Sequence, residues 1–199
     1  PEASDKITVV GVPPPDDFCS FWEQFPKDRT FSSNLTLFYP ATFYPHKNHS
    51  ILSNIDKNSD CLSVKEIYLT IDTDKNPCKP SNLIKCTGNL TMSECVTLYR
   101  KCDALLFLST NESYGIPLIE AMYSGIYVIC PDLDYSRVLC GDGAIYFSPN
   151  NVESLYSAIR EVSERIKLAA YPNWEKQLNS IPKSWKEVFE AIVASGNLH

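Results

Sequence analysis

The amino-acid sequence predicts an α/β fold in which a doubly wound parallel sheet is covered by helices on both faces. Two observations lead to this prediction. Short apolar runs rich in β-branched residues recur along the chain, and between them apolar residues recur with the spacing of an α-helix. Strands that are apolar at nearly every position are typical of parallel sheets with two buried faces, whose strands are joined by helical crossovers.

The predicted strands share this apolar composition and span residues 7–10, 35–39, 67–69, 104–108, 126–130 and 144–147. A further strand-like run ends near Cys86. In open parallel sheets, ligands bind outside the carboxyl ends of the strands. We therefore expect the functional residues in the loops that follow Tyr39, Cys86, Leu108 and Cys130.

The predicted helices carry apolar residues about one turn apart. One apolar stripe runs from Cys95 to Cys102, and Thr91 and Glu94 supply a capping box in front of it. A second stripe extends over three turns between residues 155 and 166. Each stripe predicts a helix with one face against the sheet.

Residues 167–199 are predicted to form a helical tail of a single domain that spans residues 1–199. Pro172 and Pro182 interrupt the helical pattern, because proline lacks the amide hydrogen that continues a helix. We expect Trp174 and Trp185 to anchor the tail by packing against the domain.

The composition indicates a folded protein and excludes some functions. Hydrophobic residues make up 44% of the 199 residues, which is enough for a core, and the net charge is −6. That acidic balance argues against nucleic acid as a partner. The sequence has no apolar run of about 18–20 residues and no signal-peptide pattern, so we expect a cytoplasmic protein. Because the chain does not begin with Met, we expect it to be part of a longer protein.

Neither the cysteines nor the acidic motifs indicate a metal site. The eight cysteines include no C-x-x-C pair and lie largely in apolar patterns, which predicts reduced, mostly buried thiols. Asp72 and Asp74 form a D-x-D, but their polar loop favours a solvated turn. His46 and His49 have no third ligand nearby in the sequence. We therefore expect no metal and no cofactor.

One strand–loop–helix segment contains the most informative motif. The loop carries Gly115, and the helix after it has Pro117 in its first turn. The backbone amides of Gly115 and Ile116 are then expected to face the strand ends, where unpaired N–H groups and the helix dipole favour a phosphate. Glu112 in the loop and Glu120 in the helix can flank this anion site and accept hydrogen bonds from sugar hydroxyls.

The spacing of the two glutamates is not distinctive by itself, since Glu153 and Glu161 share it. The complete segment from Glu112 to residue 122, followed by Gly125 and a strand, carries more information. It resembles the donor-binding signature of the group 1 (family 4) retaining glycosyltransferases of the GT-B fold.

Three further segments resemble the same family in the same order. Residues 38–48 resemble the strand and loop whose lysine contacts the donor diphosphate, which implies that role for Lys47. Residues 87–90 resemble the segment beside the nucleobase, and residues 142–149 resemble the closing strand. Thr42 stands where many members carry arginine, so Lys47 acts alone or with His46 or His49.

The resemblance implies that the chain is the C-terminal, Rossmann-like half of such an enzyme, without the N-terminal acceptor domain. Glu112 and Lys47 are the implied catalytic residues, beside the donor sugar and the diphosphate. Glu120 is expected to hold the ribose, whereas Tyr114 either contacts the ligand or packs. The implied donor-binding residues are Thr42, His46, Gly88, Asn89, Leu90, Ser113, Tyr114, Gly115, Ile116 and Glu120.

The resemblance also implies a reaction. A hexose is transferred with retention from a nucleoside diphosphate sugar, with GDP or UDP favoured, to a glycan acceptor, and no metal is needed. The full-length protein is expected in the cytoplasm, with peripheral association at the cytosolic face of a membrane, and the fragment alone is expected to be inactive. Two alternatives stay open: a sugar-nucleotide epimerase of the same fold, and a non-catalytic nucleotide-binding domain, which Thr42 favours.

Overall fold

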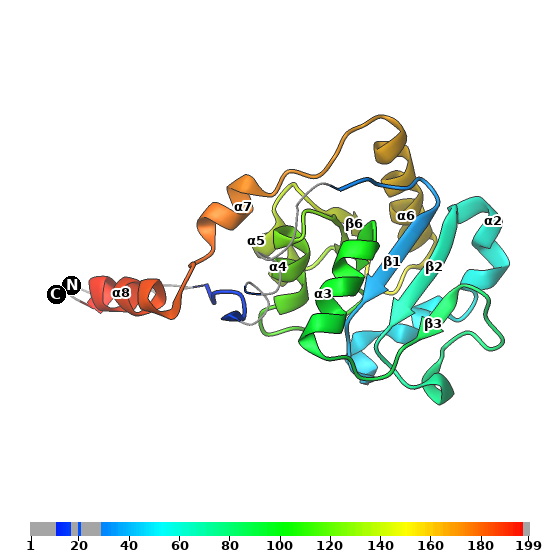
Figure 1. Ribbon diagram of the computed structural model, residues 1–199, viewed down its shortest axis with the longest axis horizontal. Helices are drawn as coiled ribbons and strands as arrows, with labels where there is room; N and C mark the ends of the chain where they lie inside the picture. The colour runs from blue at the N-terminus through cyan, green and yellow to red at the C-terminus, as the bar shows by residue number, and fades with distance from the viewer. Residues whose placement is uncertain (1–10, 17–19, 21–28, 197–199) are drawn as a thin grey trace, which may run out of the picture.

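Six parallel strands form one sheet in the order β3-β2-β1-β4-β5-β6 in the computed structural model (Figure 1). The structure describes residues 11–16, 20 and 29–196. Every neighbouring pair of strands is parallel, which confirms the predicted doubly wound α/β fold. The strands are β1 (Leu35–Tyr39), β2 (Val64–Leu69), β3 (Ile84–Cys86), β4 (Ala104–Leu106), β5 (Tyr127–Pro131) and β6 (Ile145–Phe147).

The central strand β1 coincides with its predicted range, and all of its residues are buried. It pairs with β2 on one side and with β4 on the other, where Leu37 lies opposite Ala104. The strand β4 ends at Leu106, two residues before the predicted end, although Phe107 and Leu108 remain buried. The strand predicted at residues 7–10 lies outside the described residues.

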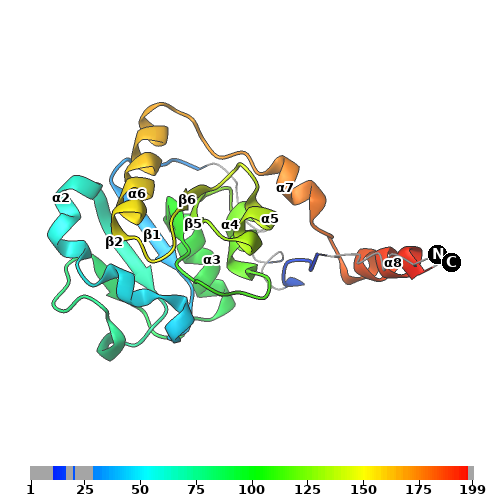
Figure 2. The same ribbon diagram turned by 180° about the vertical axis from the view of Figure 1, so that it is seen from behind.

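Helices cover both faces of the sheet. Figure 1 shows α3 (Met92–Lys101) and α4 (Ile116–Tyr123) on the near face, and Figure 2 shows α6 (Val152–Lys167) on the opposite face. The helix α4 packs on β4 and β5, and α6 packs on β5 and β6. The shorter helical elements are η1 (Pro45–Lys47), η2 (His49–Leu52), η3 (Ile55–Asn58), α2 (Ser59–Leu62), η4 (Thr73–Lys75) and α5 (Asp134–Cys140).

The ends of α3 and α4 follow from local sequence signals. The backbone N–H of Glu94 donates to Thr91 Oγ1 over 3.3 Å, and the N–H of Thr91 donates to Glu94 Oε2 over 2.8 Å, which confirms the predicted capping box. The helix α4 begins after Gly115, at φ +86°, and ends before Gly125, at φ +66°. Glycine suits both positions because a side chain disfavours this left-handed region.

The first part of the tail packs as predicted. The helix α7 (Glu175–Ser180) begins three residues after Pro172. Trp174 is 4% exposed, and its Nε1–H donates to the carbonyl oxygen of Ile126 over 2.9 Å. Its ring leaves no room for a side chain at Gly143, where a Cβ would lie 2.9 Å from Trp174 Cε3. Trp174 therefore anchors the tail on the sheet.

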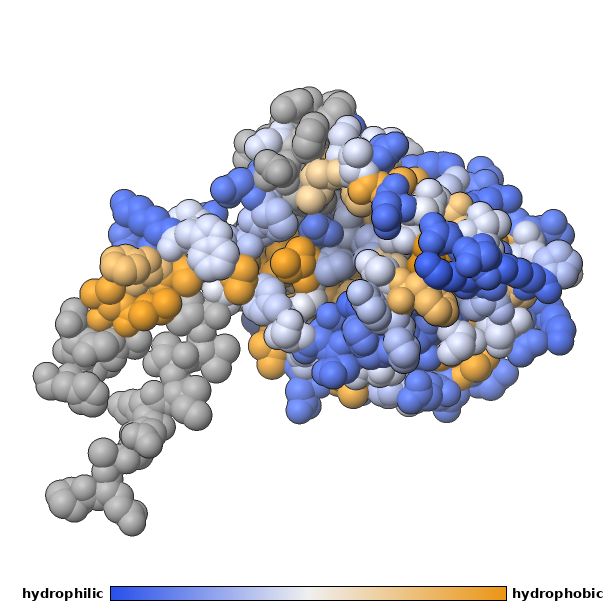
Figure 3. Space-filling model, turned by 90° about the horizontal axis from the view of Figure 1, so that it is seen from below, coloured by the Kyte–Doolittle hydropathy of each residue, from blue (hydrophilic) through white to orange (hydrophobic). Residues whose placement is uncertain are grey.

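The last helix, α8 (Trp185–Gly196), projects from the body of the domain (Figures 1 and 2). Trp185 is 62% exposed, so the prediction that it anchors the tail is wrong. Figure 3 shows apolar side chains gathered over α8, and Phe189, Ile192 and Val193 are exposed on this helix. Because α8 projects from the domain, Trp185 lies away from the core. The apolar character of Trp185 by itself does not determine whether its helix packs on the sheet.

The seven described cysteines are free thiols. Four of them are buried, as predicted: Cys78, Cys102, Cys130 and Cys140. Cys61 is exposed, and Cys86 and Cys95 are only half-buried, although Cys86 ends β3 and the stripe of Cys95 places it on the buried side of α3. Within the described ranges, none of the helices is both long enough and apolar enough to span a membrane.

Candidate functional site

The loops after β1 and β4 lie where the chain changes direction across the sheet. The strands β1 and β4 are neighbours in the sheet. The chain continues from β1 to β2 on one side of this pair, and from β4 to β5 on the other side. In doubly wound sheets such a switch point opens a crevice at the carboxyl ends of the strands. Lys47 and Glu112 occupy these two loops, so the topology brings together residues that lie 65 positions apart in the chain.

Lys47 and Glu112 form an ion pair across the switch point. The Lys47 Nζ donates to Glu112 Oε1, and the two side chains are 19% and 14% exposed. The hydroxyl of Tyr39, at the end of β1, donates to the carbonyl oxygen of Lys47 over 3.0 Å. Burial raises the pKa of Tyr39, so this hydroxyl keeps its proton. The predicted catalytic residues therefore lie together, with their charges mutually compensated.

The backbone of His46 joins the loop after β1 to the loop after β4. The side chains in the sequence give no sign of this contact. Its carbonyl oxygen accepts from the backbone N–H of Thr110 over 2.8 Å and from the Ser109 hydroxyl over 3.2 Å. The Thr110 hydroxyl adds a third contact at 3.2 Å. Tyr135, in α5, donates in turn to the carbonyl oxygen of Ser109 over 2.6 Å. These bonds fix the position of Lys47 relative to Glu112.

The helix α4 begins four residues after Glu112 in the chain. Gly115 is the N-cap residue in a left-handed conformation, and a Cβ there would approach Leu118 Cδ1 to 3.0 Å. The first amides of a helix have no intrahelical acceptor, so the amide of Ile116 can donate to a ligand. Ser113 is exposed in the loop before it. Gly115 and Ile116 therefore form a helix N-terminus, and the binding of an anion to their amides stays a prediction.

The hydroxyl of Tyr114 contacts the protein backbone. It accepts from the N–H of Val12 over 2.6 Å and donates to the carbonyl oxygen of Val12 over 3.1 Å. The half-buried side chain also packs against the core. Of the two expectations for Tyr114, these contacts favour packing, and they join Val12 to the loop before α4.

A small pocket at the same edge is lined by the loops after β1, β2 and β3 and by α3. Its volume is about 250 Å³, and Thr42, Asn89 and Leu90 line it together with Pro40, Ala41, Thr70 and Cys95. Gly88 lies beside it with φ +68°, and its N–H donates to the carbonyl oxygen of Ile71 over 3.0 Å. The predicted nucleobase segment therefore borders a depression that the first residues of the Lys47 loop also line.

Glu120 lies in the second turn of α4 and is buried, with 8% exposure. Its Oε2 accepts from the hydroxyl of Tyr99, in α3, over 2.8 Å. Burial raises the pKa of Glu120, and the bond from Tyr99 opposes this shift. The sequence motif contains Glu120 but gives no sign of Tyr99 as its partner.

The two histidines near Lys47 differ in environment. His46 is exposed and its ring stacks on Tyr44, with 5.8 Å between centroids. His49 is 2% exposed and lies between the rings of Tyr39 and Phe43. Burial lowers the pKa of His49 to about 4, and the charge of Lys47 acts in the same direction. His49 is therefore neutral at neutral pH and does not supply the second cation.

The D-x-D motif lies in an exposed turn around η4. Lys75 pairs with Asp72 over 2.9 Å between Nζ and Oδ2, and Asp74 is exposed beside them. This agrees with the predicted solvated turn. Among the described residues, no three or more His, Cys, Asp or Glu side chains are grouped so that they could hold a metal ion.

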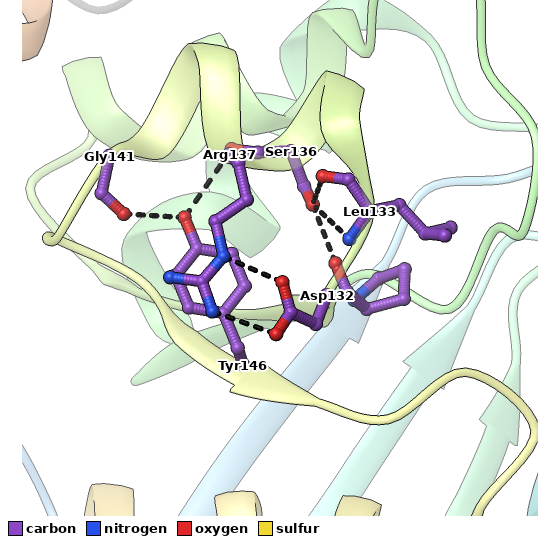
Figure 4. Close-up of polar contacts among 7 residues, drawn as sticks. Asp132, Leu133, Ser136, Arg137, Gly141 and Tyr146 are labelled. Carbon is purple, nitrogen blue, oxygen red and sulfur yellow. Dashed lines mark hydrogen bonds and ion pairs between the residues drawn. The ribbon is translucent and has the colours of Figure 1, made fainter.

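A polar cluster at the neighbouring strand end supports this edge of the sheet (Figure 4). Arg137 donates to both carboxylate oxygens of Asp132, over 2.6 and 2.8 Å, and its guanidinium lies 3.6 Å from the ring centre of Tyr146. The hydroxyl of Tyr146 donates to the carbonyl oxygen of Gly141 over 2.6 Å. The cluster joins β5, α5 and β6, and so holds the helix that carries Tyr135.

The sequence profile of the family described as "Glycosyl transferases group 1" matches residues 76–175, half of the chain. The chain belongs to this family. The match includes Glu112, Glu120 and the start of α4, whereas Lys47 lies before it.

Relatives of this glycosyl transferase chain include two bacterial enzymes. The O-antigen chain mannosyltransferase RfbU of Salmonella typhimurium is 28% identical over 135 residues, which are 61% of this chain and 36% of RfbU. The serotype-specific mannosyltransferase WbdA of Escherichia coli is 29% identical over 105 residues, which are 53% of this chain and 12% of WbdA. The chain thus spans well under half the length of these relatives.

Solved glycosyltransferase structures share the fold. TarM of S. aureus superposes with a TM-score of 0.67 at 19% identity, over 85% of this chain and 37% of TarM. The catalytic domain of starch synthase IV from Arabidopsis thaliana superposes with a TM-score of 0.61 at 13% identity, over 91% and 41% of the two chains. These likenesses confirm the Rossmann-like fold predicted for the C-terminal half of a GT-B enzyme.

Proposed function

We propose that this chain is the donor-binding domain of a retaining hexosyltransferase, which transfers a sugar from a nucleoside diphosphate to a glycan acceptor. One observation carries the proposal. In a chain of the group 1 family, Lys47 and Glu112 pair at the switch point of the sheet, and α4 begins four residues after Glu112. A cation and a helix N-terminus together suit a diphosphate.

The donor is proposed to lie along the strand ends. Its diphosphate would contact the amides of Gly115 and Ile116 and the ammonium group of Lys47. Glu120 would accept from the ribose hydroxyls. The nucleobase would enter the pocket of about 250 Å³ lined by Asn89 and Leu90, which is next to the loop of Lys47.

The main catalytic effect would be electrostatic. Negative charge develops on the departing nucleoside diphosphate as the glycosidic bond breaks, and preorganised positive groups stabilise it. Lys47 and the α4 amides would supply this stabilisation, while Glu112 would lie beside the sugar. The ion pair between Lys47 and Glu112 implies that the donor phosphate competes with Glu112 for Lys47. Retention rests on the family resemblance, and we name no nucleophile.

The acceptor is proposed to bind through an N-terminal domain of the longer protein. The names of RfbU and WbdA, both mannosyltransferases, support a hexose donor and a polysaccharide acceptor. The TarM structure contains UDP and the starch synthase structure contains ADP, so the neighbours do not agree on a base. We propose a GDP- or UDP-linked donor, no metal, and a cytoplasmic location with peripheral membrane contact of the longer protein.

Calorimetry with UDP, GDP, ADP and dTDP tests the donor site. We expect one diphosphate to bind the 199-residue chain equally well in EDTA and in Mg²⁺. Lys47→Ala should weaken the binding of that diphosphate and leave the affinity for the bare nucleoside unchanged. If none of the four diphosphates binds, the proposal is contradicted. Equal losses of affinity for the diphosphate and the nucleoside would indicate a folding defect in the variant.

Product analysis with the longer enzyme tests the reaction. We expect an acceptor-dependent transfer that keeps the anomeric configuration of the donor sugar. Epimerisation of the donor without an acceptor would identify the epimerase alternative. Tight nucleotide binding without either reaction would identify the non-catalytic alternative.

A further inference from the structure

Tyr99 contacts Glu120 from a different helix, in the interior of the domain. The Tyr99 side chain is fully buried on α3, whereas Glu120 lies on α4 with 8% exposure. The Tyr99 hydroxyl donates to Glu120 Oε2 over 2.8 Å, and it also lies 3.4 Å from the carbonyl oxygen of Pro117. The contact therefore links α3 to the first two turns of α4.

The packing around Tyr99 restricts its ring. Phe38, in β1, meets it edge to face, with 5.0 Å between centroids and 82° between the ring planes. The guanidinium of Arg29 donates to the carbonyl oxygens of Tyr99 and Cys102 over 2.7 and 2.6 Å, which fixes the end of α3. Because Phe38 restricts the ring of Tyr99 and Arg29 restricts its backbone, the Tyr99 hydroxyl is held in one position.

The bond orients a buried carboxylate. Burial raises the pKa of Tyr99 well above its ordinary value, so the hydroxyl stays protonated and donates. The Tyr99 hydroxyl donates to Oε2 of Glu120. Among the hydrogen bonds of the described residues, none involves Glu120 Oε1. Cys95, one turn before Tyr99 on α3, lines the small pocket, so the same helix carries Tyr99 and borders the proposed nucleobase position.

We infer that Tyr99 is a positioning residue, which directs Glu120 Oε1 toward the ribose hydroxyls and thereby sets the preference of the site for ribonucleotides. This inference rests on the proposed function. A carboxylate that is free to rotate would meet the ribose with either oxygen and in several rotamers, whereas a carboxylate held at one oxygen is preorganised for the diol. Tyr99 itself touches no substrate in this arrangement.

The test compares ribonucleotides with 2′,3′-dideoxynucleotides. UDP, GDP and ADP and their dideoxy analogues are titrated into the 199-residue chain by calorimetry, and the affinity ratio of the two forms is measured. We expect the wild-type chain to prefer the ribonucleotide about ten-fold or more, since the diol donates to a carboxylate. In Tyr99→Phe we expect this ratio to fall to about three-fold, with the dideoxy affinity unchanged within about two-fold.

Matched variants separate positioning from folding. Tyr127→Phe removes another tyrosine hydroxyl, which donates to the carbonyl oxygen of Ala170 over 3.1 Å, and it should keep the wild-type ratio. Glu120→Gln should lower the ratio by itself, and adding Tyr99→Phe should lower it little further, because the two residues act as one unit. Phe38→Leu, which frees the Tyr99 ring from its other side, should also lower the ratio and provides a second route if Tyr99→Phe fails to fold.

Each contrary result has a distinct meaning. If folded Tyr99→Phe keeps the wild-type ratio of ribonucleotide to dideoxynucleotide affinity, the inference is overturned. An equal loss of affinity for both forms of the nucleotide in this variant also overturns it. A wild-type chain that binds diphosphates without ribose preference also overturns it, while the proposed donor site stands. A wild-type chain that binds none of the diphosphates overturns the proposed function and this inference with it.

Discussion

Replacement of Glu112 by glutamine is expected to tighten the binding of the free nucleoside diphosphate. In the structure Lys47 is paired with Glu112, so a diphosphate must share Lys47 with a carboxylate and also approach that carboxylate. Glutamine keeps the size of the side chain and removes its negative charge. The variant should therefore bind the bare diphosphate more tightly while transferring sugar less well, because Glu112 is proposed to lie beside the donor sugar.

The magnitude follows from Coulomb's law and the partial burial of the pair. Two unit charges about 5 Å apart interact by about 3 kcal/mol at an effective dielectric constant of about 20, and by about 1 kcal/mol in water. The side chains of Lys47 and Glu112 are 19% and 14% exposed, which places the site between these limits. We expect a gain of about 1–2 kcal/mol, or about five- to thirty-fold in affinity.

Calorimetry at fixed ionic strength measures this gain against two controls. The bare nucleoside should bind Glu112→Gln and the wild-type chain equally, because it carries no phosphate. Glu161→Gln makes the same change of net charge by breaking the exposed ion pair with Arg165 on α6, and it should leave the diphosphate affinity unchanged. An unchanged or weaker affinity in Glu112→Gln would refute the proposed competition for Lys47.

Three further predictions concern the stability of the fold. Because the pKa of His49 is about 4 when folded and about 6.5 when unfolded, the unfolded chain takes up the proton first. The free energy of unfolding should therefore fall by about 2–3 kcal/mol from pH 6.5 to pH 4, and His49→Leu should flatten this dependence in urea titrations. Thr91→Ala removes the capping box of α3 and should lower the urea-unfolding free energy by about 1 kcal/mol, whereas an unchanged value would contradict a role for the cap. Gly143→Ala would place a Cβ against the Trp174 ring, so we expect a loss of about 1–3 kcal/mol and altered tryptophan fluorescence; a stable variant with unchanged fluorescence would contradict the packing.

Local patterns determined the elements of this protein. The apolar run that became β1, the capping box of α3, and the glycine before α4 were all predictable, because each depends on residues within one or two turns of the chain. The sequence also contained the family signature around Glu112 and Glu120, which the family match supports. Their roles in donor binding stay predictions that the experiments above address.

Tertiary structure decided which of these residues meet and with what charge. The order of the strands places the loop of Lys47 beside the loop of Glu112, and burial of His49 makes it neutral although its sequence position suggested a second cation. The bond from Tyr99 to Glu120 joins two helices that no local pattern relates. The apolar Trp185 was expected to pack but lies on the projecting α8. Periodicity reports the side of an element that is apolar, whereas neighbours, burial and pKa depend on how the whole chain folds.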